Sequence, residues 1–217
     1  RCVQSAELMR RILEYAQMLD LPVYDHCQDE SLTQGAVMAE GEVRPKLGLR
    51  GWPPATEELI VMRNAILARE TGAHVHCQHM SSGYSVEVLK WAKSQDIPIT
   101  GELSPHHMAL TEQVVDGFNV NAKMNPPLRS ETHRQDLIQG LLDGWLDCIC
   151  TDHAPHARHE KEVEFDYAPF GIVGLETSLA VCLEELYHSG KASLSRIVDW
   201  LSTRPAAIGR LEGGSLQ

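Results

Sequence analysis

The string TDHAPH at positions 151–156 contains the side chains best suited to hydrolytic chemistry in this sequence. Asp152 directly follows an apolar stretch that is typical of a strand. A carboxylate placed there can bind a metal ion through one oxygen and accept a proton from metal-bound water with the other. The alternative is an N-cap or turn aspartate. His153 and His156 beside it, and further histidines at other strand ends, favour the metal site.

His26 and His79 each stand at the end of a predicted strand. Neutral imidazole is a common zinc ligand, and two imidazoles from neighbouring strands together with a carboxylate suit a hydrolytic metal. The competing pair is His74 and His76, an H-x-H pattern. Side chains alternate between the two faces of a strand, so this pair and His79 have opposite parity and cannot serve one metal together. We therefore favour His79.

The elements that must position these residues alternate between strands and helices. Each helix is predicted from apolar residues at helical spacing, and each strand from a short apolar run. The predicted helices cover residues 2–20, 56–71, 82–94, 131–145, 175–188 and 194–201. The predicted strands cover residues 21–26, 73–78, 97–102 and 146–151, and residues 30–54 are expected to form a loop.

This alternation predicts an α/β fold with parallel strands and right-handed crossovers. No glycine-rich phosphate fingerprint opens any of the helices, which weakens a nucleotide-binding doubly wound fold. Polar residues instead crowd just after each strand, as they do at the active face of a TIM barrel. Four strand–helix units make about half of such a barrel, so we expect a half-barrel.

Composition narrows the function classes further. The 217 residues carry 19 basic and 30 acidic side chains, a formal net charge of −11, which argues against nucleic acid or an anionic membrane surface as a partner. No apolar run is long enough to span a membrane, and no signal peptide opens the sequence. The 6 cysteines include no C-x-x-C pair, so reduced thiols and a cytoplasmic location are expected. Cys148 and Cys150 are interpreted as core residues.

Six strings occur in an order that resembles a known family. They are DHCQD at 25–29, HMSS at 79–82, ELSPHH at 102–107, NPPLR at 125–129, TDHAPH at 151–156 and PFGIVGLET at 169–177. The series resembles the dihydroorotases of the longer, bacterial type, within the amidohydrolase superfamily. NPPLR alone is shared with hydantoinases and allantoinases, whereas DHAPH and PFGIVGLET together point more narrowly to dihydroorotase.

The resemblance implies a TIM-type (β/α)8 barrel and a metal centre. His26 and His79 would be zinc ligands at the ends of barrel strands five and six, and Asp152 would be a ligand and the general acid and base at the end of strand eight. The reaction implied is the reversible hydrolysis of dihydroorotate to N-carbamoyl-aspartate in de novo pyrimidine (UMP) biosynthesis. One or two zinc ions are expected.

The resemblance also implies substrate-binding residues. Asn125, His156 and the backbone around Pro169, Phe170 and Gly171 would hold the substrate ring and its carboxylate. Partners implied for the family are the small-molecule substrate, aspartate transcarbamoylase or a second copy of the chain. The residues alone leave the roles of Glu102, His106 and His107 open, since these side chains could equally shape a polar turn at a strand end.

Some family features lie outside this sequence. The H-x-H pair of strand one, the carboxylate or carboxylated lysine of strand four and a substrate-binding arginine would all precede residue 1. The small β-domain usual in the superfamily is also missing, and the sequence does not begin with methionine. We therefore expect residues 1–217 to be a single segment of the catalytic barrel, spanning helix four to helix eight, incomplete at its N-terminus and inactive on its own.

Two alternative functions stay open. One is a different cyclic amidohydrolase, such as an allantoinase or a dihydropyrimidinase, which His156 and the PFG string disfavour. The other is a non-catalytic pseudo-dihydroorotase that scaffolds aspartate transcarbamoylase. The presence of His26, His79 and Asp152 counts against that role.

Overall fold

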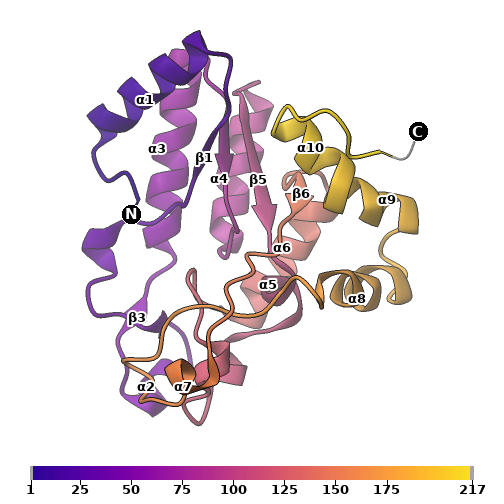
Figure 1. Cartoon of the computed structure of the whole chain (residues 1–217). Coiled ribbons are helices and arrows are strands. Elements are labelled where there is room, and N and C mark those ends of the chain that lie inside the picture. Colours follow the sequence, from indigo (N-terminus) through magenta and orange to yellow (C-terminus); the bar gives the residue numbers. More distant parts are fainter. Residues whose placement is uncertain (1, 216–217) are drawn as a thin grey trace.

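The computed structural model describes residues 2–215 and centres on a four-stranded parallel sheet with the order β1-β4-β5-β6 (Figure 1). The strands are β1 (Val23–Asp25), β4 (Val75–Cys77), β5 (Ile99–Leu103) and β6 (Cys148–Ile149). Since all four are parallel, their carboxyl ends meet at one edge of the sheet. That edge carries the polar residues that follow each strand, so the parallel α/β prediction is confirmed.

Four long helices form the layer that packs against the sheet. They are α1 (Ala6–Met18), α3 (Ala55–Thr71), α4 (Gly83–Ser94) and α6 (Glu131–Leu142), and each contacts the next in chain order. Ser5 caps α1 by accepting a hydrogen bond from the Leu8 N–H, and α3 ends at Gly72, which adopts a left-handed φ of 72°. Apolar side chains such as Val75, Leu89 and Leu141 fill the core between the two layers.

The segment predicted as a loop over residues 30–54 is more ordered than expected. It contains η1 (Glu30–Leu32), α2 (Arg44–Leu47) and a two-stranded parallel sheet of β2 (Met38–Ala39) and β3 (Gly51–Trp52). A second, smaller apolar core, which includes Val43, Leu128 and Phe165, explains this order because it packs the segment against later loops. Those loops carry α5 (Pro105–Ala109), η2 (Glu112–Val115), η3 (Val120–Ala122) and α7 (Arg158–Lys161).

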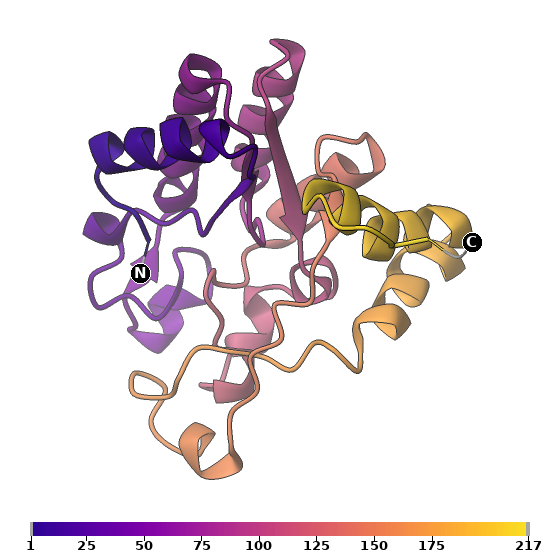
Figure 2. The same ribbon diagram turned by 45° about the horizontal axis from the view of Figure 1, so that its top comes forward.

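The C-terminal helices lie beside β6, away from the α1–α3 side of the sheet (Figure 2). Two runs alternate between α-helical and π-helical turns: α8 (Ser178–Cys182) continues into η4 (Leu183–His188), and α9 (Leu194–Val198) continues through η5 (Asp199–Thr203) into α10 (Arg204–Ile208). The last run is longer than the predicted residues 194–201 because Trp200 and Ile208 are buried along it. Among the described residues, no helix is both long and apolar enough to cross a membrane.

Candidate metal and substrate site

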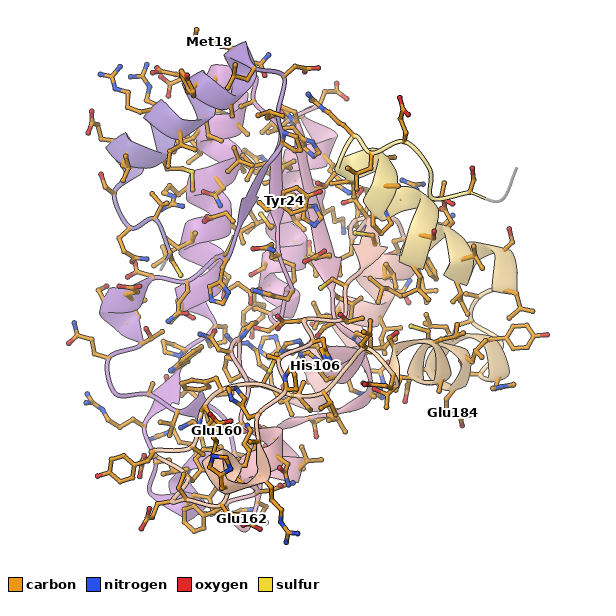
Figure 3. The ribbon with its side chains drawn as sticks, viewed as in Figure 1. Met18, Tyr24, His106, Glu160, Glu162 and Glu184 are labelled. Carbon is orange, nitrogen blue, oxygen red and sulfur yellow. The ribbon has the colours of Figure 1, made fainter. Side chains whose placement is uncertain are left out.

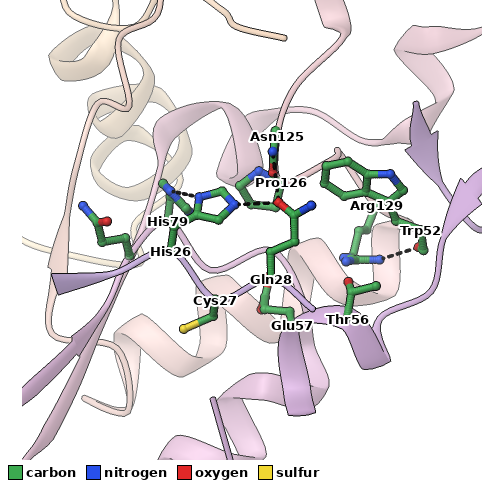
Figure 4. A pocket seen from close by; sticks show the side chains of 11 residues that line it. His26, Cys27, Gln28, Trp52, Thr56, Glu57, His79, Asn125, Pro126 and Arg129 are labelled. Atoms are coloured by element: carbon green, nitrogen blue, oxygen red, sulfur yellow. Dashed lines mark hydrogen bonds between the residues drawn. The ribbon is translucent and has the colours of Figure 1, made fainter. Parts of the chain in front are cut away.

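Two histidine rings meet at the carboxyl edge of the sheet (Figure 4). His26 follows β1 and His79 follows β4, and His26 Nδ1 lies 2.8 Å from His79 Nε2. The ring centroids are 4.5 Å apart in an edge-to-face arrangement. Residues 53 positions apart in the sequence thus present two nitrogens to one point, as two imidazole ligands of a metal do.

The main chain holds His79 in an uncommon conformation. Its φ is 32°, and its backbone N–H donates to Glu102 Oε1 on β5 at 3.2 Å. Its Nδ1 atom is buried without a hydrogen-bond partner. Burial and the nearby His26 lower the pKa of His79 to about 4. The ring is therefore neutral near pH 7, the state in which imidazole binds a metal.

Asp152 shares two features with His79. It is a non-glycine residue with a positive φ, here 44°, and its Oδ2 atom is buried with no hydrogen-bond partner. Burial raises its pKa, with the charge of His26 acting in the opposite direction. A buried carboxylate oxygen left without a donor is costly unless a cation or a proton reaches it. Asp152 therefore presents an unpaired ligand atom at a strand end, whereas the unpaired atom of His79 is Nδ1 and not the Nε2 atom that faces His26.

Gln28 joins the histidine pair to a predicted substrate residue. Its Oε1 atom lies 2.9 Å from His26 Nε2 and accepts a hydrogen bond from Asn125 Nδ2 at 3.1 Å. Asn125 Oδ1 is itself buried and unpaired. A cavity of about 530 Å³ opens here, lined by Tyr24, Asp25, His26, Gln28, Asn125 and neighbouring residues. Gln28 belongs to the DHCQD string, although its residue type and position alone do not single it out as a site residue.

The other predicted substrate residues contact one another. His156 Nε2 lies 2.9 Å from the backbone oxygen of Phe170, and Lys161 Nζ donates to the oxygen of Pro169 at 2.8 Å. Gly171 has a φ of 149°, and a Cβ there would lie 2.4 Å from the oxygen of Ala154. None of these residues lines the 530 Å³ cavity beside Asn125. The centroid of the Phe170 ring lies 5.6 Å from that of Trp52, which lines the smaller pocket of Figure 4.

The loop after His79 is fixed by two charged residues that sequence reasoning missed. Glu57 on α3 accepts hydrogen bonds from the Ser81 N–H, the Ser81 hydroxyl and the Ser82 N–H at 2.9, 2.6 and 3.0 Å. Arg129 Nε donates to the Ser81 hydroxyl at 2.9 Å. The only sequence signal was the place of Arg129 in NPPLR and of Glu57 at the start of a helix. Both residues therefore hold the backbone that follows His79 through their contacts with Ser81 and Ser82.

The residues whose roles the sequence left open are buried. His106 Nε2 and His107 Nδ1 lie 2.8 and 2.6 Å from the Ser104 hydroxyl, and His107 Nε2 lies 3.0 Å from the oxygen of Pro126. Figure 3 shows His106 among packed side chains beyond the ends of the strands. These histidines connect the end of β5 to the loop that carries Asn125.

Comparison with known proteins gives consistent matches. A family model described as "Dihydro-orotase-like" matches residues 1–85. The chain is 46% identical to a dihydroorotase of Endomicrobium trichonymphae over 97% of its own length and 50% of that relative. It is also 46% identical to a dihydroorotase of Mycobacterium tuberculosis, again over 97% of its length and 49% of that relative. The chain thus spans about half the length of the curated relatives it matches.

Solved structures agree in fold. An L-hydantoinase from Arthrobacter aurescens superposes with a TM-score of 0.86 at 23% identity, covering 98% of this chain and 49% of that one. A D-hydantoinase from a Bacillus sp. AR9 superposes with a TM-score of 0.83 at 27% identity, covering 93% and 46%. The half-barrel prediction is therefore confirmed in architecture, since the chain matches about half of each of these amidohydrolase barrels.

Proposed function

We propose that this chain, which is similar to dihydroorotases along about half of their length, belongs to that family and takes part in the reversible hydrolysis of dihydroorotate to N-carbamoyl-aspartate. The observation that carries the proposal is the convergence of His26 and His79, with their ring nitrogens 2.8 Å apart, in a chain 46% identical to a dihydroorotase. The proposal includes a place in de novo pyrimidine biosynthesis and a cytoplasmic location.

The residues present fit a zinc centre. His26 and His79 offer ring nitrogens 2.8 Å apart, and Asp152 offers a buried oxygen that lacks a hydrogen-bond partner. These three side chains would hold one or two zinc ions. When bound, zinc polarises a carbonyl group and lowers the pKa of a water molecule toward neutrality.

Asp152 is the proposed general base and acid. In the hydrolytic direction it accepts the proton of the attacking hydroxyl group as the C–O bond forms at the ring carbonyl. It then donates that proton to the ring nitrogen as the C–N bond breaks, so that no net proton remains on the carboxylate. Burial raises the pKa of Asp152, which makes its carboxylate a better proton acceptor than an exposed aspartate.

Asn125 and the loop that includes His156 are the proposed substrate-binding elements. Asn125 presents an unpaired Oδ1 atom beside the cavity next to His26, where it can accept a hydrogen bond from a ring N–H. His156 contacts the backbone oxygen of Phe170, and this pair together with the backbone of residues 169–171 would contact the substrate carboxylate. Because the net charge of −11 repels an anionic substrate, such local donors must attract it.

The test compares substrates on the native protein that carries this sequence. We expect turnover of dihydroorotate and of N-carbamoyl-aspartate, and little turnover of hydantoin or dihydrouracil. Preferential hydrolysis of hydantoin would instead support a hydantoinase, the class of enzyme to which the structural neighbours belong by name. Absence of all turnover in the metal-loaded protein, with aspartate transcarbamoylase bound, would support a scaffolding role. Association with that enzyme or with a second copy rests on the family resemblance alone.

A further inference from the structure

Three potential metal ligands from three adjacent strands meet inside the fold, and neither His26 nor His79 is among them. They are His76 on β4, Glu102 on β5 and Cys148 on β6, and one donor atom from each lies within 4.8 Å of the other two. All three residues are buried, with 0%, 8% and 1% of their surface exposed. The register of the sheet brings them together, because Glu102 pairs with Cys148 and His76 pairs with Thr100. The H-x-H histidine and the C-x-C cysteine that appeared unrelated in sequence are neighbours here.

The spacing of the donor atoms matches a coordination sphere. His76 Nε2 lies 3.1 Å from Glu102 Oε2, and Cys148 Sγ lies 3.9 Å from the same oxygen. A tetrahedral zinc ion with bonds of about 2.0 Å to nitrogen and oxygen and about 2.3 Å to sulfur sets its donors about 3.3 to 3.5 Å apart. The observed separations lie on either side of that range, so small side-chain movements would close them around an ion.

His76 is oriented as a metal ligand. Its Nδ1 atom lies 2.7 Å from the Thr100 hydroxyl, which in turn lies 2.8 Å from His74 Nε2. Its Nε2 atom is buried and makes no hydrogen bond, although Glu102 is close. His76 Nε2 and Glu102 Oε2 are therefore close enough to bind one cation between them. Metal-binding histidines commonly engage their second nitrogen in this way, which fixes the ring and leaves the other nitrogen free.

We propose that His76, Glu102 and Cys148 form a second metal site, distinct from the His26, His79 and Asp152 centre, that takes a divalent ion of borderline softness such as Zn²⁺. The mixed nitrogen, oxygen and sulfur donors select such an ion over Mg²⁺ or Ca²⁺. The site does not depend on the proposed reaction.

The ion would have a structural role. It would join three adjacent strands through their side chains, and Glu102 would transmit its position to the site at the sheet edge. Glu102 uses Oε2 toward His76 and Cys148 and Oε1 to accept the backbone N–H of His79. The orientation of His79 would therefore depend on an ion that never contacts it.

Cobalt substitution of the native protein tests the site, because sulfur is a donor only here. The proposed His26 centre contains nitrogen and oxygen ligands alone, so an intense sulfur-to-cobalt charge-transfer band reports the second site specifically. We expect this band in the Co²⁺-loaded protein. Cys148→Ser should abolish the band and remove about one equivalent of cobalt, while Cys182→Ser, which removes a buried thiol on α8, should retain both.

Two outcomes would overturn the proposal: a folded, cobalt-loaded wild-type protein without the band, or a Cys148→Ser variant that keeps it. Loss of the band in Cys27→Ser but not in Cys148→Ser would assign the sulfur to the residue beside His26 and also reject the site. If Cys148→Ser fails to fold, X-ray absorption of the zinc-loaded wild type decides, since it must show a sulfur neighbour. Failure to hydrolyse dihydroorotate with the band present would refute only the proposed function.

Discussion

Glu102 on β5 accepts a hydrogen bond from the backbone N–H of His79 at 3.2 Å. A side chain on one strand thus supports a residue with a positive φ at the end of the neighbouring strand, β4. A positive φ at a non-glycine residue costs about 1 kcal/mol or more and persists only where neighbouring contacts maintain it. The hydrogen bond from Glu102 is one contact that maintains this conformation of His79. Its orientation toward His26 is the feature on which the predictions about the metal depend.

Replacement of Asp152 with asparagine should separate chemistry from binding. Asn keeps the size of the side chain but cannot accept a proton, so we expect turnover to fall by about 10²- to 10⁴-fold while KM changes little. Steady-state kinetics on the metal-loaded native protein measures both values. Turnover close to that of the wild type would show that another residue moves the proton.

His79→Ala should remove metal from the sheet-edge centre. The loss of one ligand is expected to lower metal affinity by about 100-fold or more, judged against the 10- to 100-fold cost of losing a mere supporting residue. The matched control is His133→Ala. His133 lies on α6, accepts a hydrogen bond from the Gly83 N–H at the start of α4 and belongs to neither proposed site. Metal analysis after dialysis compares the two. Equal losses would remove His79 from the ligand set.

Acidification should destabilise the protein through His106. Burial lowers its pKa to about 3 from an ordinary 6.5, so between those values the unfolded chain binds a proton that the folded chain excludes. The contribution of His106 to the free energy of unfolding is therefore fully present above pH 6.5 and falls as the pH is lowered toward 3. At pH 5 the loss from this residue is about 2 kcal/mol. Urea unfolding at pH 7 and pH 5 measures the loss.

His106→Gln should reduce that acid sensitivity, whereas the exposed His188→Gln should leave it unchanged. His107, whose pKa burial also lowers, adds to the effect and stays in both variants. An unchanged pH dependence in His106→Gln would show that this ring takes up its proton without unfolding.

Gly171→Ala should weaken substrate binding more than it weakens the fold. A Cβ at this position would meet the oxygen of Ala154 at 2.4 Å, at a φ of 149° that other residues rarely adopt. The loop must shift away from His156, so we expect KM for dihydroorotate to rise about tenfold or more. Gly117→Ala is the control, because it also has a positive φ but faces open space. An equal rise in KM in the two variants would show that the effect comes from backbone strain and not from the position of Gly171 beside His156.

The fold was largely predictable because its signals are local. Alternating apolar runs placed all four strands of the main sheet, and helical spacing placed α1, α3, α4 and α6 within a few residues. The main error was the loop over residues 30–54. Its short strands and α2 depend on Phe165 and Leu128, which lie more than seventy residues further along the sequence. No window within the loop could reveal that packing.

The site was predictable only in part. Strand-end position identified His26, His79 and Asp152 as candidates, because parallel strands bring their carboxyl ends together. Glu57 carried no such signal, and Glu102 ended a predicted strand without revealing its role, since the function of both depends on which backbone N–H groups they face. The neighbourhood of His76 and Cys148 likewise depends on the strand order, which alternation alone does not determine.

Gln28 has one further consequence, which concerns thermodynamic linkage. A single oxygen of its amide contacts a proposed metal ligand, His26, and a proposed substrate residue, Asn125. A substrate that draws the Asn125 amide toward itself leaves this oxygen to His26 alone, and a metal that reorients His26 changes what Asn125 can offer. Any coupling that results must be reciprocal, so substrate tightens or loosens metal binding by the same factor by which metal alters substrate affinity.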